Sequence, residues 1–189
     1  MPSAVASTAP SLRLRFRWPN DGLMPAIRFP WVVWIQNDIL HYPKRTMMPV
    51  QTIWLVDDDA DDCMLFEDAI TEMGVTIAVV CVTDGADLLN KLRQATVVPD
   101  ILFLDVNMPV KNGLDCLNEL KRDERFNQVP VVMWSTSGQS ETVEKAYQAG
   151  ARLFMKKPHN FNKLKTLLYE ILQLDLETSV SLEDFLVGK

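Results

Sequence analysis

Residues 52–74 have the sequence TIWLVDDDADDCMLFEDAITEMG, in which an apolar run is followed by a longer amphipathic segment. The first five residues form a nearly continuous apolar run, which predicts a strand buried on both faces of a parallel sheet. From Ala60 to Met73 apolar residues recur every three or four positions, and Gly74 follows, which predicts an amphipathic helix that ends at a glycine. A buried strand followed by an amphipathic helix is the repeating unit of an α/β fold.

Four more units of the same kind follow towards the C-terminus. The predicted strands are residues 76–82, 101–104, 131–134 and 153–155, and the predicted helices are residues 85–94, 114–122, 140–149 and 162–174. Together with residues 52–74 they predict a doubly wound (βα)5 sandwich of class α/β, with a five-stranded parallel sheet and right-handed crossovers.

Polar side chains follow the predicted strands where the strands end. In open α/β folds function collects at the carboxyl ends of the strands, and here these ends carry Asp57 and Asp58, Asp105, Ser135 and Lys157. Hard oxygen ligands without a nearby His or Cys suit Mg²⁺. A carboxylate beside Mg²⁺ can attack phosphorus, while an ammonium and a hydroxyl stabilise charge on the phosphoryl oxygens. The pattern therefore predicts phosphoryl chemistry at one rim of the sheet.

These residues lie in segments that resemble the receiver (CheY-like) domain of two-component response regulators. The resemblance runs from about Val50 to Leu174 and implies the flavodoxin-like strand order 2-1-3-4-5. The matching segments are IWLVDDD at 53–59, ILFLDVNMP at 101–109, VPVVMWSTSG at 129–138 and LFMKKPHN at 153–160.

The resemblance also implies the metal and acceptor residues. Asp105 would be the phosphoacceptor. Asp58 would bind Mg²⁺ directly and Asp57 mainly through water, and the backbone carbonyl of Asn107 would complete the protein ligands.

Further residues match the positions with which this family responds to phosphorylation. Ser135 matches the switch Thr or Ser, and Lys157 matches the lysine that precedes a proline. The peptide bond between Lys157 and Pro158 is expected to be cis, which would aim the lysine into the pocket. Phe154 stands where many receivers have a switch tyrosine, so an aromatic rotamer switch would lack one hydroxyl group.

Other residues have simpler interpretations. Asp59 is expected to cap the helix that starts at Ala60, with Asp61 and Asp62 favoured by the helix dipole. The three cysteines form no CxxC motif and are interpreted as reduced thiols that pack in the core; they are Cys63, Cys81 and Cys116.

The charge and the prolines divide the chain into three parts. Residues 1–47 hold six basic and two acidic side chains and six of the 11 prolines. We therefore expect residues 1–48 to be a poorly structured extension, or the result of a misassigned start. Residues 49–175 are the predicted receiver domain, and residues 176–189 are a C-terminal tail that either docks on a neighbouring subunit, folds back or frays.

The predicted function is that of a stand-alone, cytoplasmic receiver that signals through proteins. It would accept a phosphoryl group on Asp105 from a histidine kinase or phosphotransfer protein with Mg²⁺, show only weak autophosphatase activity, and bind an unknown protein target, with a homodimer possible. The net charge of −6 argues against nucleic acid, and no apolar run is long enough to span a membrane. Two alternatives stay open: a Mg²⁺-dependent aspartyl-phosphate hydrolase, and an interaction module that needs no phosphorylation.

Overall fold

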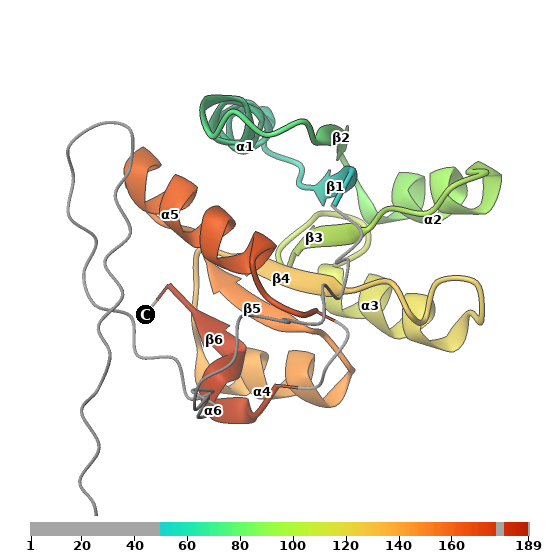
Figure 1. Cartoon of the computed structure of the whole chain (residues 1–189). Coiled ribbons are helices and arrows are strands. Elements are labelled where there is room, and N and C mark those ends of the chain that lie inside the picture. Colours follow the sequence, from blue (N-terminus) through green and yellow to red (C-terminus); the bar gives the residue numbers. More distant parts are fainter. Residues whose placement is uncertain (1–49, 177–179, 189) are drawn as a thin grey trace, which may run out of the picture. The chain divides into compact units, whose positions relative to one another are not determined.

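Strands and helices alternate along the chain in the computed structural model, which describes residues 50–176 and 180–188 (Figure 1). The predicted N-terminal extension lies outside the described residues. None of the helices in the described ranges has the length and apolarity to span a bilayer. The strands are β1 Thr52–Val56, β2 Ala78–Val82, β3 Ile101–Asp105, β4 Val131–Ser135, β5 Leu153–Lys156 and β6 Leu186–Val187. The helices are α1 Ala60–Glu72, α2 Gly85–Gln94, α3 Gly113–Arg122, α4 Ser140–Gln148, α5 Phe161–Leu172 and α6 Leu182–Phe185.

The strands form one sheet in the order β2-β1-β3-β4-β5-β6, and every neighbouring pair is parallel. The predicted order 2-1-3-4-5 is therefore confirmed, and the sheet carries a sixth strand that was not predicted. All five residues of β3 and of β4 are buried, which agrees with their continuous apolar sequence.

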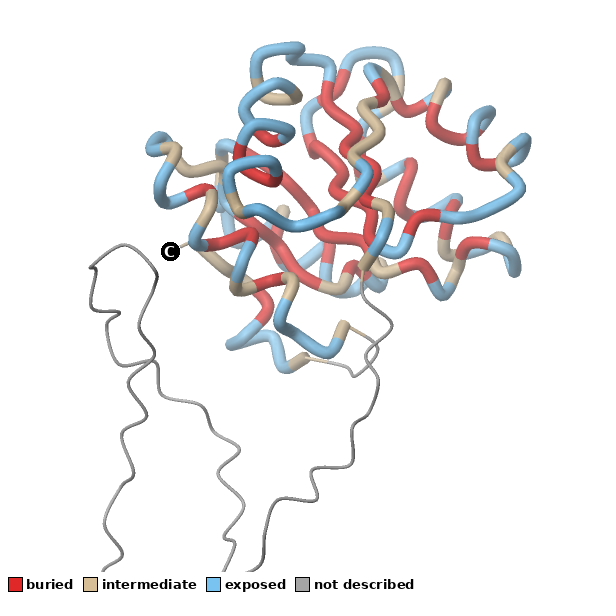
Figure 2. The backbone as a smooth tube through the Cα atoms, turned by 45° about the horizontal axis from the view of Figure 1, so that its top comes forward, coloured by how far each residue is buried: buried red, intermediate tan, exposed pale blue. Residues whose placement is uncertain are grey.

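Two hydrophobic layers enclose the sheet. One layer packs strand side chains such as Leu55 and Phe103 against Phe66 of α1 and Leu168 of α5. The other packs the opposite face of the strands against α2, α3 and α4. Buried residues accordingly follow the central strands and the inner sides of the helices, while the outer helix surfaces are exposed (Figure 2).

Side-chain caps fix where four of the first five helices begin. The carboxylate of Asp59 accepts a hydrogen bond from the backbone N–H of Asp61 at the start of α1, as expected. Asp84, Asn112 and Asn160 cap α2, α3 and α5 in the same way. Each cap comes shortly after a strand end, so the caps also set the path of the loops that carry the polar rim.

The C-terminal tail folds back onto the sheet within the same chain. Ser181 caps the single-turn helix α6, and β6 then adds to the edge of β5 with Leu186 opposite Phe154. Phe185, the last residue of α6, is fully buried. Of the three arrangements expected for the tail, the structure therefore shows the one in which it folds back onto its own chain.

Two of the cysteines are paired, so the expectation of three reduced thiols is wrong. Cys63 of α1 and Cys81 of β2 form a disulfide with their Cα atoms 6.3 Å apart. The helical spacing that turns Cys63 towards the sheet also brings it beside the edge strand, which sequence spacing alone does not reveal. Cys116 is free and buried, and burial raises the pKa of its thiol to about 11.

Candidate functional site

Three carboxylates meet at the carboxyl ends of β1 and β3. Asp57 follows β1 directly, Asp58 comes next, and Asp105 ends β3. One oxygen of each lies within 4.8 Å of the others. Asp57 is 2% and Asp105 is 4% exposed, whereas Asp58 is exposed to solvent. These three predicted metal ligands are therefore brought together by the parallel pairing of neighbouring strands.

The composition of this triad fits a hard divalent cation. All its donor atoms are carboxylate oxygens, with no His or Cys among them, which is the ligand type that Mg²⁺ prefers. The exposed side of Asp58 leaves room for the waters that Mg²⁺ usually keeps. Asn107 is also at this rim, where its backbone N–H donates to Asp105 Oδ2 at 2.7 Å. Its carbonyl remains a predicted ligand.

Lys157 follows β5 and brings a positive charge to the same place. Its Nζ lies 2.7 Å from Asp57 Oδ2, 2.7 Å from Asp62 Oδ2 and 3.1 Å from Asp105 Oδ1. The side chain is only 11% exposed. The ammonium of Lys157 thus contacts Asp105, the predicted phosphoacceptor, directly. It reaches Asp105 from the end of β5, which is separated from β3 by β4.

Two pKa values at this rim are raised, for different reasons. Burial raises the pKa of Asp57, and hydrogen bonds from Lys157 and from the backbone of Asp59 only partly offset it. Burial alone would lower the pKa of Lys157, but its bonds to Asp57 and Asp62 and the charge of Asp105 raise it well above the usual range. The raised pKa of Lys157 reflects the negative charge gathered around it, which also favours a bound cation.

Trp134 takes part in the site, a role that its place in the apolar strand 131–134 does not predict. It is buried on β4, and its indole N–H donates to Asp57 Oδ2 at 2.8 Å. Its ring also faces the Lys157 ammonium at 5.5 Å from the centroid. A polar edge on an otherwise apolar side chain is the signal that points to such a role.

Asp62 is a second residue of the site whose contact the sequence does not predict. It lies in the first turn of α1, as expected, and its carboxylate also forms an ion pair with Lys157. Ninety-five positions separate the two residues, so only the contact between α1 and the strand ends brings them together.

Ser135 ends β4 and is 1% exposed. Its hydroxyl accepts hydrogen bonds from the backbone N–H of Ser137 at 3.3 Å and from Asn107 Nδ2 at 3.5 Å. Its backbone carbonyl accepts from the N–H of Lys157 at 2.7 Å. Ser135 therefore joins the loop after β3 to the end of β5, at the same rim as the carboxylates.

Phe154 lies on β5 and is fully buried. Its ring is 6.4 Å from Phe185 of the tail, and Phe185 in turn makes an edge contact with Tyr147 of α4 at 5.2 Å. Phe154 is thus in the inward position, covered by the tail.

The expected cis bond before Pro158 is not found, because the described residues contain no cis peptide. In the trans form the Lys157 ammonium reaches three carboxylates.

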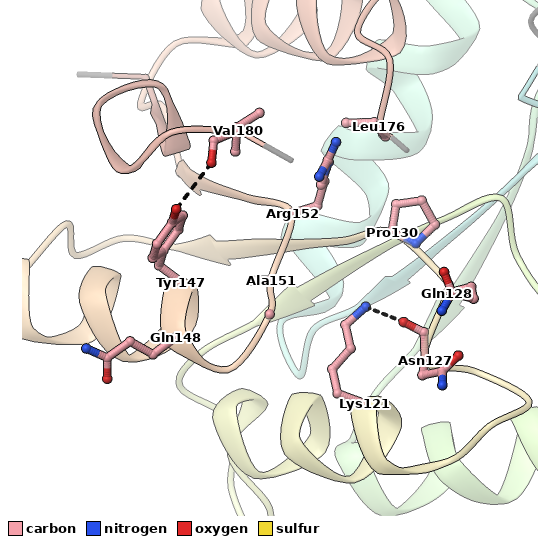
Figure 3. Close-up of a pocket in the computed structure, with 11 residues that line it drawn as sticks. Lys121, Asn127, Gln128, Pro130, Tyr147, Gln148, Ala151, Arg152, Leu176 and Val180 are labelled. Atoms are coloured by element: carbon pink, nitrogen blue, oxygen red, sulfur yellow. Dashed lines mark hydrogen bonds between the residues drawn. The ribbon is translucent and has the colours of Figure 1, made fainter. Parts of the chain in front are cut away.

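A cavity of about 720 Å³ lies at the opposite, amino-terminal ends of β4 and β5 (Figure 3). Lys121, Arg152, Pro130 and Tyr147 are among its lining residues. Burial lowers the pKa values of Lys121 and Arg152. Lys121 Nζ donates to the carbonyl oxygens of Asn127 and Val129. The cavity is separate from the acidic rim.

Comparisons with known proteins agree with this fold and this rim. The model of the response regulator receiver domain matches residues 53–169. The probable methanogenesis regulatory protein FilR2 of Methanothrix harundinacea is 31% identical over 123 residues, which cover 63% of this chain and 79% of FilR2. Response regulator Rcp1 of Synechocystis sp. is 26% identical over 135 residues, which cover 69% of this chain and 92% of Rcp1.

Two solved structures are similar to this chain. The phosphorylated cyanobacterial phytochrome response regulator RcpA has a TM-score of 0.62 at 30% identity, over 69% of this chain and 97% of RcpA. The Mn²⁺-bound form of Rcp1 has a TM-score of 0.60 at 25% identity, again over 69% and 97%. The order of the strands, the acidic triad and these matches lead to one conclusion: the chain belongs to the response regulator receiver domain family.

Proposed function

We propose that this chain is a phosphoacceptor receiver, in which Asp105 takes a phosphoryl group from a histidine kinase or a histidine phosphotransfer protein. The observation that carries the proposal is the contact of Lys157 Nζ with Asp105 Oδ1 at 3.1 Å, beside two further carboxylates. A carboxylate that is buried beside both a cation site and an ammonium group is suited to attack phosphorus.

The proposed transfer is a nucleophilic substitution at phosphorus. One Asp105 oxygen forms a bond to phosphorus while the P–N bond of phosphohistidine breaks, and the imidazole nitrogen that leaves takes up a proton. With acetyl phosphate a P–O bond breaks and acetate leaves. The Lys157 ammonium and the Ser135 hydroxyl then donate hydrogen bonds to phosphoryl oxygens.

The residues of the triad would hold the divalent ion that this chemistry needs. Asp58 and Asp105 are proposed as direct ligands of Mg²⁺, Asp57 mainly through water, and the carbonyl of Asn107 as the remaining protein ligand. When bound, the ion neutralises the crowded carboxylates and the charge of the incoming phosphoryl group. Rcp1, a similar protein, has been solved in a Mn²⁺-bound form, which supports the proposal of a divalent ion.

The output is proposed to be a phosphorylation-dependent interaction with another protein. Ser135 would shift towards the phosphoryl group. It pairs with Lys156 of β5, which lies two positions after Phe154 on the same strand, so Phe154 would respond to this shift. The surface of α4, β5 and the tail would then change its binding properties. The proposed receiver unit comprises residues 49–175. A cytoplasmic location, a homodimer and weak autophosphatase activity remain part of the proposal.

Acetyl phosphate tests the proposal directly. The purified chain, incubated with acetyl phosphate and Mg²⁺, is expected to gain the mass of one phosphoryl group, and hydroxylamine should remove it. Asp105→Asn is expected to gain none, because an amide is not a nucleophile for phosphorus. Asp58→Ala should lose the Mg²⁺-dependent change in fluorescence expected from Trp134, whose indole N–H bonds to Asp57.

Two results would contradict the proposal. Absence of a hydroxylamine-labile product from the wild-type chain would exclude an acyl phosphate. Partner binding that is equal for the wild-type chain with donor and for Asp105→Asn would instead favour an interaction module that works without phosphorylation.

A further inference from the structure

The Lys157 ammonium has one partner that does not belong to the acidic triad. Asp57 and Asp105 are two of the three triad carboxylates. The third partner of Lys157 is Asp62, which comes from the first turn of α1 and bonds to Nζ at 2.7 Å. Counted over the side chain alone, Asp62 is 29% exposed, against 1% for Asp57 and 5% for Asp105.

Asp62 is not occupied with capping its helix. The cap of α1 is the side chain of Asp59, which accepts from the N–H of Asp61. The Asp62 carboxylate therefore has its oxygens available for the ammonium, which approaches from the end of β5. Charge-assisted bonds of this length are the strong class of hydrogen bond.

An ammonium group has three N–H donors. Two of them form the hydrogen bonds of 2.7 Å to Asp57 and Asp62. The contact with Asp105 at 3.1 Å is an ion pair without a hydrogen bond, so the third donor remains for a phosphoryl group on Asp105. A divalent ion in the triad would share the charge of Asp57 and Asp105, which weakens their hold on the lysine. Asp62 is then the anchor that the ion leaves unchanged.

We infer that Asp62 is a positioning residue, which holds Lys157 so that its free donor points at the phosphoryl group on Asp105. This inference rests on the proposed phosphoacceptor function and adds a residue to it. Asp62 is not one of the triad carboxylates, and it acts through its hydrogen bond with Lys157. The cation–π contact of Lys157 with Trp134 at 5.5 Å limits the ammonium from another side.

The variant Asp62→Asn, with Asp61→Asn as its control, separates positioning from net charge. Asp61 is the exposed neighbour, so its variant removes the same charge at almost the same place. The probe is beryllium trifluoride with Mg²⁺, a phosphoryl analogue, and Trp134 fluorescence reports its binding. We expect the apparent Kd to rise about tenfold in Asp62→Asn, as for loss of one charged hydrogen bond, and to change less than about twofold in Asp61→Asn.

The affinity for Mg²⁺ alone should remain within about twofold of wild type in Asp62→Asn, since the removed charge lies outside the triad. Asp62→Glu keeps the carboxylate and should recover most of the affinity for beryllium trifluoride. A purely structural role of Asp62 would not give this combination of a selective loss and a rescue by the conservative variant.

A second readout does not depend on phosphoryl binding. Acetylation of lysines by N-hydroxysuccinimide acetate at one pH and in excess Mg²⁺, followed by peptide mass spectrometry, reports how firmly Nζ is held. Lys156 is the exposed neighbour and provides the internal reference. We expect Lys157 to react several-fold faster relative to Lys156 in Asp62→Asn than in the wild-type chain, and Asp62→Glu to restore protection.

The outcomes are distinct. If the wild-type chain binds no beryllium trifluoride and forms no acyl phosphate, the proposed function fails, while the acetylation result still decides whether Asp62 holds Lys157. If the wild-type chain binds the probe and Asp62→Asn behaves like Asp61→Asn, the positioning role is wrong. Tighter binding of the probe by Asp62→Asn would also overturn it, because Asp62 would then compete with the phosphoryl group for the lysine.

Discussion

Asp57 is an ionisable residue whose burial lowers the stability of the folded protein at neutral pH. It is 2% exposed, and burial raises its pKa above the value of 3.8 for a free side chain. The raised pKa means that the charged form is disfavoured in the folded protein at neutral pH. Asp57→Asn is therefore expected to raise the free energy of unfolding at pH 7, because Lys157 keeps Asp62 and Asp105 as partners.

Thermal unfolding measures this effect, with Asp68→Asn on the exposed side of α1 as the charge-matched control. Asp57→Asn should unfold at least about 2 °C above the wild-type chain, and the control should not. Because the folded pKa of Asp57 is the higher one, the stability it contributes is complete below pH 3.8 and is lost as pH rises through the folded value. The advantage of Asp57→Asn should accordingly shrink as the pH falls, and an advantage that grew on acidification would contradict this assignment.

At the scale of residues, the sequence predicts the triad and Lys157 because strand ends are placed by the fold itself. It does not predict that Trp134 donates to Asp57, or that Asp62 bonds to Lys157. The residues of these two pairs are 77 and 95 positions apart. From the sequence, Trp134 is equally well interpreted as a core side chain, and Asp62 as a charge in the first turn of a helix. The missed residues are therefore those whose role depends on a contact rather than on a position.

At the scale of elements, α3 begins against the end of β3 with no space for a side chain. A Cβ at Gly113 would lie 2.0 Å from the backbone oxygen of Asp105 and 2.9 Å from its carbonyl carbon. Both are backbone atoms, which cannot rotate away. Gly113→Ala is expected to lower the free energy of unfolding by about 2 kcal/mol or more, and to displace the phosphoacceptor.

Gly138 provides the matched control, since the nearest atom to a Cβ there is the flexible Lys156 side chain at 3.9 Å. Urea unfolding and Mg²⁺ binding are compared for the two variants. Gly113→Ala should impair both, and Gly138→Ala should change neither by more than about 0.5 kcal/mol. Equal stability of the two variants would show that α3 can move away from β3 without loss.

The tail forms a second interface between elements. Phe185 is fully buried against Phe154 and Tyr147, while Leu182 one turn earlier is 48% exposed. Truncation of a buried Phe removes about 3–5 kcal/mol of packing, more than the two residues of β6 are expected to replace. Phe185→Ala is therefore expected to release α6 and β6 and leave the rest of the sheet folded.

Amide hydrogen exchange locates this effect. In Phe185→Ala the amides of Leu186 and Val187 should lose their protection, whereas those of β3 and β4 should keep it; Leu182→Ala should resemble the wild-type chain. The exposed edge of β5 should also favour self-association at high concentration. Unchanged protection at residues 186 and 187 would mean that backbone pairing alone holds the tail.

The tail also explains where prediction from the sequence ends. The first five helices are long enough to show an apolar period, and the first five strands form apolar runs. The predicted bounds of all ten lie within two residues of those observed. Helix α6 has four residues and β6 has two, which is too short for any period to appear. Such short elements exist because α4 and β5 offer a surface to pack against, and that surface is known only after folding.

At the scale of the whole molecule, the sheet is closed on both faces by the helices of residues 60–172. One layer is formed with α1 and α5 and the other with α2, α3 and α4, each from buried apolar residues of the described part of the chain. Each buried apolar side chain contributes about 1.5–3 kcal/mol, so these two layers dominate the stability of the receiver unit. Within the described residues nothing in either layer calls for the preceding segment.

A chain that starts at Met48 is therefore expected to unfold in urea at the same midpoint as the full chain. Its Mg²⁺-dependent fluorescence change should persist, with less background because Trp18, Trp31 and Trp34 are removed. A chain that starts after Val56 is the control: it lacks β1, which lies between β2 and β3, and should not fold. A lower midpoint for the Met48 chain would show that residues 1–47 stabilise the receiver unit, and the two hydrophobic layers would then not suffice to account for its stability.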